Sequence, residues 1–208
     1  MIDIFSLTQH EYVESVFSRL GKGRQIAAKV YSQWYKEGRI PELSEIFLSA
    51  RPLLAEVISI TDFSILSTFE QKGSKWLQTF PDALQSESVE IQMKFGTTLC
   101  LSSQVGCRMG CAFCETGRLG LIRSLSVKEI VLQLFFSKVL RKLDVRNLVF
   151  MGMGEPFDNY EAVKQAIRIF TDPFGFGLGP SRITVSTSGL VDILEQFTLE
   201  VDPRVKLA

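Results

Sequence analysis

The second half of the chain alternates strand-like and helix-like segments, and this alternation restricts the possible folds more than any other feature. Strand-like apolar segments lie at 97–102, 147–151, 182–186 and 204–208, and helical periodicity fills 126–141 and 161–170. Strands that alternate with helices pair in parallel through right-handed crossovers. The sequence therefore predicts an α/β fold built on a parallel sheet.

The length of this region predicts an incomplete barrel. A closed barrel of eight strand–helix units needs roughly 200 to 250 residues, and six units of comparable length would need more than about 150. Only about 110 residues follow Thr97. We therefore expect roughly half of a barrel, with an open sheet edge at its last strand.

The residues before the barrel region predict helices first and antiparallel strands second. Thr8 and Glu11 form a capping box ahead of a helix that stops at Gly21, and a second helix is expected over 25–37. Period-two alternation over 87–95 is typical of a strand. We expect a helical accessory domain at 1–62, an antiparallel strand segment at 63–95 and the barrel part at 96–208.

Charge and composition exclude several classes of protein. The 23 basic and 23 acidic side chains balance, so the chain is not expected to bind nucleic acid through a uniformly positive surface, although local contacts stay possible. A hydrophobic fraction of 46% argues against disorder. No apolar run approaches the roughly 18 residues of a membrane span, and the first residues lack a secretory signal. Four clustered cysteines do not make a disulfide scaffold, so we expect a cytoplasmic protein.

Three of the four cysteines lie close together in a glycine-containing loop directly after a predicted strand. Cys107, Cys111 and Cys114 have the spacing C-x3-C-x2-C. Three thiolates on one loop can bind three corners of a cubane iron–sulfur cluster. The fourth iron would then lack a protein ligand, and the amine and carboxylate of an amino acid could complete its coordination.

Two other interpretations of the cysteines stay open on spacing alone. A structural zinc needs a fourth ligand, which would have to be Cys100 or the single histidine, His10, and neither has the usual paired spacing. The thiols could also be ordinary core residues, since free cysteine is often buried.

The cysteine spacing, with Phe113 before the third cysteine, is the signature of the radical S-adenosylmethionine (SAM) superfamily. Four segments resemble the RlmN/Cfr family of RNA adenine methyltransferases: TLCLSSQVGC at 98–107, MGMGEP at 151–156, FGFG at 174–177 and TVSTSG at 184–189. The resemblance covers nearly the whole chain. It implies a partial radical SAM (β/α) barrel that follows a small helical domain involved in RNA handling.

The resemblance also implies the cofactors and their binding residues. Cys107, Cys111 and Cys114 would hold a [4Fe-4S] cluster, and Phe113, Gly154, Glu155 and Ser186 would contact S-adenosyl-L-methionine. A glycine permits close backbone approach, and a carboxylate can accept hydrogen bonds from an ammonium group. Tight turns would also explain the glycine and serine residues.

Two further residues match catalytic positions of the family. Cys100 would form a transient disulfide that releases the product, and Glu87 would accept the proton removed from the adenine ring. Glu90 lies close enough to Glu87 to confuse the alignment. A core cysteine and an exposed strand glutamate are the alternatives.

The implied activity is radical methylation of carbon 2 of adenosine in 23S rRNA and tRNA, with an external electron donor; methylation of carbon 8 is the other activity of the family. The target base must leave its stack to react. In the family, a cysteine in the C-terminal part carries the methyl group, but no cysteine follows Cys114 here. The sequence is therefore expected to be a fragment, a truncated product or half of a split enzyme. The alternative function is a protein that binds a cluster and RNA without turnover.

Overall fold

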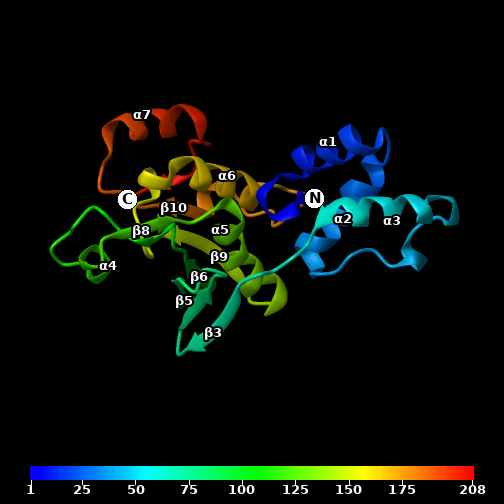
Figure 1. Ribbon diagram of the computed structural model, residues 1–208. Helices are drawn as coiled ribbons and strands as arrows, with labels where there is room; N and C mark the ends of the chain where they lie inside the picture. Colours follow the sequence, from blue (N-terminus) through cyan, green and yellow to red (C-terminus); the bar gives the residue numbers. More distant parts are fainter.

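The computed structural model describes residues 1–208 as three sheets and seven α-helices. The α-helices are α1 (Gln9–Leu20), α2 (Arg24–Glu37), α3 (Arg51–Ile60), α4 (Glu115–Arg118), α5 (Val127–Leu134), α6 (Tyr160–Thr171) and α7 (Val191–Glu200). Helices α1 to α3 lie at one end of the molecule and the loop that carries α4 lies at the other (Figure 1). None of the helices has the length and apolar character that a membrane crossing requires.

The main sheet has seven strands in the order β11-β10-β9-β6-β5-β4-β3. They are β3 (Thr68–Lys72), β4 (Lys75–Thr79), β5 (Gln85–Met93), β6 (Gly96–Cys100), β9 (Val145–Phe150), β10 (Ile183–Val185) and β11 (Lys206–Leu207). Strands β6, β9, β10 and β11 are parallel, whereas β3, β4 and β5 continue the sheet in antiparallel pairing. This arrangement confirms the expected α/β fold, in which helices and short antiparallel strands precede a part built on parallel strands.

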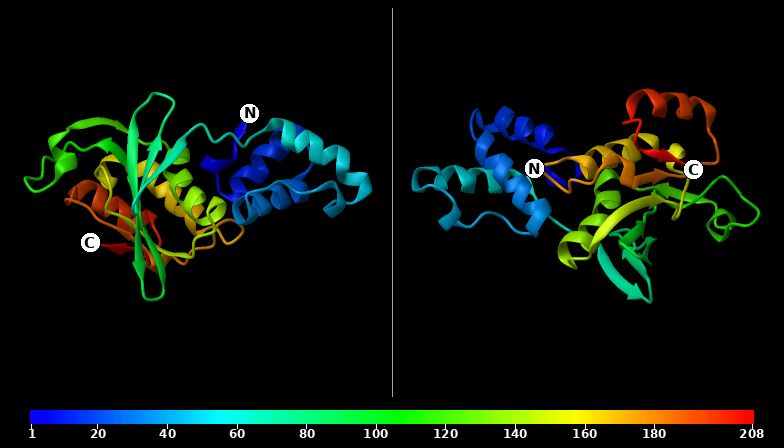
Figure 2. Two further views of the ribbon diagram at one scale, coloured as in Figure 1. Left: turned by 90° about the horizontal axis from the view of Figure 1, so that it is seen from below. Right: turned by 180° about the vertical axis from the view of Figure 1, so that it is seen from behind.

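The two faces of the parallel strands carry different kinds of side chain. Leu99, Leu148 and Ile183 are fully buried and belong to the hydrophobic core that includes α5 and α6. Cys100 and Val149, which are register partners, occupy the alternate face. Figure 2 shows α5 and α6 close to the sheet, with α1 to α3 beyond them. The alternation of the strands therefore separates a packing face from a face available for chemistry.

The N-terminal helices begin and end where the sequence predicts. The hydroxyl of Thr8 accepts a hydrogen bond from the backbone N–H of Glu11, whose side chain accepts from the N–H of Thr8, so the capping box is complete. Gly21 adopts the left-handed conformation that ends α1. A two-stranded parallel pair, β1 (Ile2–Asp3) with β2 (Thr61–Asp62), joins the first residues to the end of α3.

One aromatic cluster connects the N-terminal helices to the barrel part. Phe135 packs at centroid distances of 5.1 Å from Phe5, 5.5 Å from Trp34 and 6.1 Å from Tyr35. A single hydrophobic core accordingly contains residues from all three expected parts of the chain. The boundaries at residues 62 and 95 stay predictions.

The structure differs from the expected elements in three places. The helix expected over 126–141 begins as α5 and continues as a π-helix over Phe135–Leu140. Helix α7 was not predicted, and its first turn has no side-chain cap that would signal a helix start. Within the antiparallel segment expected from residue 63, the first strand, β3, begins only at Thr68.

Candidate functional site

A short antiparallel hairpin, also unpredicted, supports the cysteine loop. Strand β7 (Gln104–Gly106) pairs with β8 (Leu121–Ser124), and all three clustered cysteines lie in the loop between them. The backbone N–H of Cys107 donates to the carbonyl of Gly120 at 2.9 Å. Gly106 has a φ of 77°, and a Cβ atom there would lie 1.9 Å from the same Gly120 oxygen. Only glycine therefore fits at the base of this loop.

The three thiols of the loop have different environments. Cys107 is buried, whereas Cys111 and Cys114 are half-buried. Burial raises the pKa of the Cys107 thiol; a hydrogen bond from Met109 opposes this shift, and the negative charge of Glu155 adds to it. The side chains do not converge as a metal-binding group in this structure. The donor set of three sulfurs on one loop nevertheless has the chemistry that an iron–sulfur cluster requires.

Glu155 presents a buried carboxylate beside the cysteine loop. It follows β9 in the turn that contains Gly154, and only 4% of its surface is exposed. Its two oxygens accept hydrogen bonds from the backbone N–H groups of Phe157 at 2.9 Å and Ser188 at 2.8 Å. No lysine or arginine forms an ion pair with it among the salt bridges of the chain. The carboxylate keeps lone pairs that could accept from a ligand ammonium group.

The other two residues expected at the cofactor lie in different surroundings. Ser186 follows β10, and its backbone N–H donates to the carbonyl of Phe150 at 3.4 Å, so the segment from Ser186 to Ser188 lies beside the Glu155 turn. Phe113 lies on the cysteine loop with 93% of its surface exposed. The structure brings Ser186 toward Glu155 but leaves the Phe113 ring in solvent.

Cys100 and Glu87 share the face of the sheet that is opposite the helices. Cys100 is the register partner of Val89, and Glu87 lies two residues before Val89 on the same side of β5. Burial raises the pKa of the Cys100 thiol, although a hydrogen bond from the backbone of Met151 acts in the opposite direction. The Glu87 carboxylate is half-exposed and lies 3.2 Å from the ammonium of Lys75.

The neighbouring Glu90 points to the other side of the sheet. It is 8% exposed and pairs with Arg141, whose guanidinium lies 4.0 Å from the centre of the Trp76 ring. Since Glu90 lies an odd number of residues from Glu87, the two carboxylates occupy opposite faces of β5. Of the two glutamates, only Glu87 shares a face with Cys100.

Gln104 and Asp158 connect the cysteine loop to the Glu155 turn, and no local sequence pattern predicts a role for either residue. The amide oxygen of Gln104 accepts from the backbone N–H of Glu155 at 3.0 Å, and its amide nitrogen donates to Asp158 at 2.9 Å. Asp158 also pairs with Arg108, the residue after the first cysteine, at 2.8 Å. The only sequence signal was the position of Gln104 inside the TLCLSSQVGC segment.

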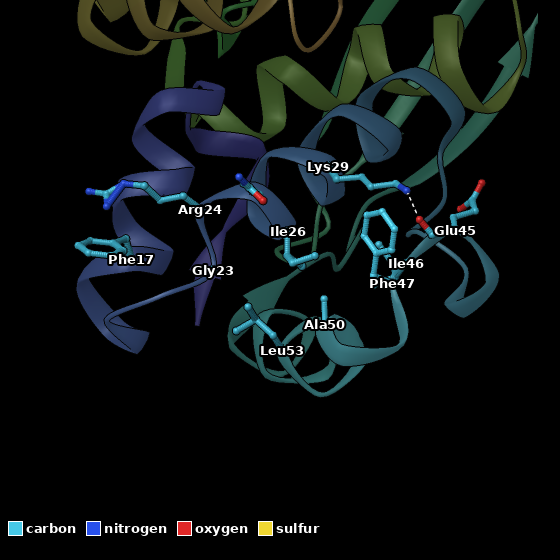
Figure 3. Close-up of a pocket in the computed structure, with 11 residues that line it drawn as sticks. Phe17, Gly23, Arg24, Ile26, Lys29, Glu45, Ile46, Phe47, Ala50 and Leu53 are labelled. Atoms are coloured by element: carbon cyan, nitrogen blue, oxygen red, sulfur yellow. Dashed lines mark hydrogen bonds between the residues drawn. The ribbon is translucent and has the colours of Figure 1, made fainter.

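A separate apolar cavity of about 470 Å³ lies among the N-terminal helices (Figure 3). Phe17, Ile26, Phe47 and Leu53 line it, and Arg24 lies at its edge. None of the residues expected to hold the cluster or S-adenosylmethionine contributes to this cavity. The candidate site is therefore the cysteine loop with the Glu155 turn, rather than this cavity.

Comparison with known proteins shows the family to which the chain belongs. Residues 101–200 match the Radical SAM superfamily. The whole chain also superposes on the crystal structure of a radical SAM methyltransferase from Sphaerobacter thermophilus, with a TM-score of 0.81 and 32% sequence identity. The match covers 100% of this chain and 62% of that chain.

Curated relatives extend the match over the N-terminal helices. A probable dual-specificity RNA methyltransferase RlmN 1 from Protochlamydia amoebophila is 49% identical over 100% of this chain and 59% of the relative. A dual-specificity RNA methyltransferase RlmN from Magnetococcus marinus is 34% identical over 97% of this chain and 58% of the relative. The chain thus spans about three fifths of the length of these relatives. From its motifs, its fold and these matches, the chain belongs to the RlmN/Cfr family of the radical SAM superfamily.

Proposed function

We propose that this chain is the cluster-bearing part of an RNA methyltransferase that acts on carbon 2 of adenosine in 23S rRNA and tRNA. The proposal rests on one observation above all: a loop with three cysteines lies beside a buried carboxylate that has no cationic partner. The relatives carry the name of dual-specificity RNA methyltransferases, which supports RNA as the substrate. The methyl-carrying cysteine of the family would come from outside this sequence, because no cysteine follows Cys114.

The cofactor site would use residues from two loops. Cys107, Cys111 and Cys114 would bind a [4Fe-4S] cluster, and the Glu155 carboxylate would accept hydrogen bonds from the ammonium of S-adenosylmethionine. Gly154 has a φ of 100°, and a side chain there would collide with Gln104, so glycine is required in the turn that places the Glu155 carboxylate. Together, these two groups supply one-electron chemistry that side chains alone lack, with the electron coming from an external donor.

The face of the sheet that carries Cys100 and Glu87 would serve the later steps. Glu87 would accept the ring proton from the adenine, because its carboxylate is half-exposed on this face. Burial keeps the pKa of the Cys100 thiol high, so the thiol is protonated near neutral pH and must lose its proton before it can act as a nucleophile. As a thiolate it would attack the sulfur of the methyl-carrying cysteine, so that a disulfide forms while the bond from that sulfur to the carbon on the base breaks and the released carbon takes up a proton. All four cysteines of this chain are free in the structure.

Anaerobic reconstitution with iron and sulfide tests the proposal. We expect bound iron and sulfide in the unchanged protein, and loss of both in a variant in which Cys107, Cys111 and Cys114 are all changed to alanine. Added S-adenosylmethionine and a chemical reductant should yield 5′-deoxyadenosine. A protein that holds zinc tightly and no iron would overturn the proposal.

The substrate requires a second experiment. The reconstituted chain would be incubated with RNA, S-adenosylmethionine and reductant, alone or with the C-terminal part of a relative supplied as a separate polypeptide. 2-Methyladenosine, measured by mass spectrometry of digested RNA, is expected only with the added part. 8-Methyladenosine would contradict the proposed regiochemistry. RNA binding without methylation in both mixtures would favour the alternative function, a cluster-binding protein without turnover.

A further inference from the structure

The side chain of Gln104 is fully buried between the two loops of the candidate site, and each of its polar atoms is hydrogen-bonded. Its Oε1 accepts from the backbone N–H of Glu155 at 3.0 Å. Its Nε2 donates to Asp158 Oδ2 at 2.9 Å and to Ser124 Oγ at 3.2 Å. The residue itself has no exposed surface. A buried amide with complete partners fixes the relative position of the groups that it joins.

These hydrogen bonds join the origin of the cysteine loop to the turn that carries the buried carboxylate. Gln104 opens β7, three residues before Cys107, and its backbone N–H donates to the carbonyl of Met153 at 3.1 Å. Asp158 continues the connection to Arg108. A Cβ atom on Gly154 would lie 2.5 Å from the Cβ of Gln104, so the two backbone segments already lie as close together as they can.

We propose that Gln104 is a positioning residue that holds the Glu155 turn at the distance from the cysteine loop at which the amino-acid end of S-adenosylmethionine can bind. The inference rests on the proposed function, because it assumes that this ligand occupies the site. An amide suits this position because it accepts from the Glu155 N–H and donates to both Asp158 and Ser124 at the same time. Leucine would leave the Glu155 N–H without its acceptor and Asp158 with only Arg108 as a partner, and glutamate would oppose a second carboxylate.

The first experiment needs no cofactor. Hydrogen exchange of the metal-free protein reports directly on the Glu155 amide, which donates to Gln104. Q104L should speed the exchange of the peptide that spans residues 153–158 by about tenfold, the effect of losing one hydrogen bond of ordinary strength. Q78L is the matched control, because Gln78 is an equally buried amide in β4 that bonds only Ser67. Unchanged exchange at 153–158 in Q104L would refute the inference.

The second experiment measures ligand affinity in the reconstituted protein by calorimetry, and ligand contact by the change that S-adenosylmethionine produces in the electron paramagnetic resonance spectrum of the reduced cluster. Q104L should bind S-adenosylmethionine about tenfold more weakly with an unchanged iron content. Q78L should bind as the unchanged protein does. Equal affinities of Q104L and Q78L would refute the inference alone, whereas absence of binding to the unchanged protein would refute the proposed function as well.

A paired exchange separates positioning from general destabilisation. Q104E places a second carboxylate against Asp158 and should weaken binding, whereas D158N can still turn its amide oxygen toward Gln104 and should bind nearly as the unchanged protein does. The double variant Q104E/D158N restores one acceptor facing one donor and keeps a carboxylate near Arg108. We expect it to recover most of the lost affinity. Binding as weak as that of Q104E would show that the hydrogen-bond pattern does not set the affinity.

Discussion

The packing at the base of the cysteine loop leaves no room for a side chain on Gly106. Gly106 lies against the carbonyl of Gly120, and this contact closes the β7–β8 hairpin just before the first cysteine. The register also shifts between Val105 and Gly106, which is typical of a bulge at a functional site. The position of Cys107 therefore depends on a residue that makes no contact through a side chain.

Replacement of Gly106 by alanine should disrupt the loop. The added Cβ would approach the Gly120 carbonyl to 1.9 Å and would favour a negative φ, so the hairpin must open. We expect loss of most bound iron after reconstitution, measured against protein concentration. Gly73→Ala is the control, because Gly73 has a similar φ of 65° in the β3–β4 turn but no neighbour within 4 Å. Equal iron in the two variants would contradict this prediction.

The Cys100 thiol should titrate above the usual range. Burial raises its pKa in the folded protein, so at pH 8 less of it is thiolate than in the unfolded chain. The rate of alkylation, followed by mass spectrometry of the Cys100 peptide, should continue to rise above pH 9 in the folded protein. In denaturant the rate should level off at lower pH. If the alkylation rate had the same pH midpoint in the folded and the denatured protein, the prediction of a raised Cys100 pKa would be wrong.

At this scale the sequence singles out candidate ligands but not the residues that hold them in place. The spacing of the cysteines and the TLCLSSQVGC segment were sufficient to single out Cys100 and the three loop cysteines. The role of Gln104 could not be predicted, because its partners Glu155 and Asp158 lie more than fifty residues away and meet it only through the parallel pairing of β6 with β9.

Whole elements were predicted well where local signals mark their ends. Helix α1 follows a complete capping box and stops at a left-handed Gly21. Helix α5 also begins at a capping box, formed by Ser126 and Glu129. Helix α7 and the β7–β8 hairpin lack such signals, since the former has no side-chain cap and the latter is short and irregular. These two elements depend on tertiary contacts that a local pattern does not contain.

Removal of the α1 cap tests the contribution of a local signal. Thr8→Ala loses the hydroxyl that accepts from Glu11, so we expect about 1 kcal/mol less stability and a melting temperature lower by about 2–4 °C. Ser18→Ala is the matched control, because Ser18 is exposed inside the same helix. Calorimetric melting of both variants makes the comparison, and equal melting temperatures would show that the cap is not needed.

At the scale of the whole molecule, one buried ring joins the helical end to the barrel part. Phe135 lies at the start of the π-helix and packs against aromatic residues from the first strand-to-helix segment and from α2. It has no exposed surface. Because the same core continues on both sides of this ring, the two ends should unfold together.

Phe135→Ala should weaken that connection. Loss of a fully buried phenylalanine costs about 3–5 kcal/mol, through lost burial and the cavity that stays behind. Urea unfolding should show the lower stability, and the peptide over 24–37 should exchange its amide hydrogens faster. Phe95→Ala is the control, since 74% of that side chain is exposed. A stability loss confined to less than 1 kcal/mol in Phe135→Ala would contradict the expected coupling.

The opposite orientation of Glu87 and Glu90 has a consequence for how β5 can change in length. Insertion of one residue between Glu87 and the β4–β5 turn leaves the glutamate in place, but one residue inserted between Glu87 and Val89 turns its carboxylate inward, into the layer where Ser88 and Glu90 are now held. Two inserted residues restore its direction and only shift it along the strand. Natural insertions or deletions between Glu87 and Val89 should therefore contain an even number of residues.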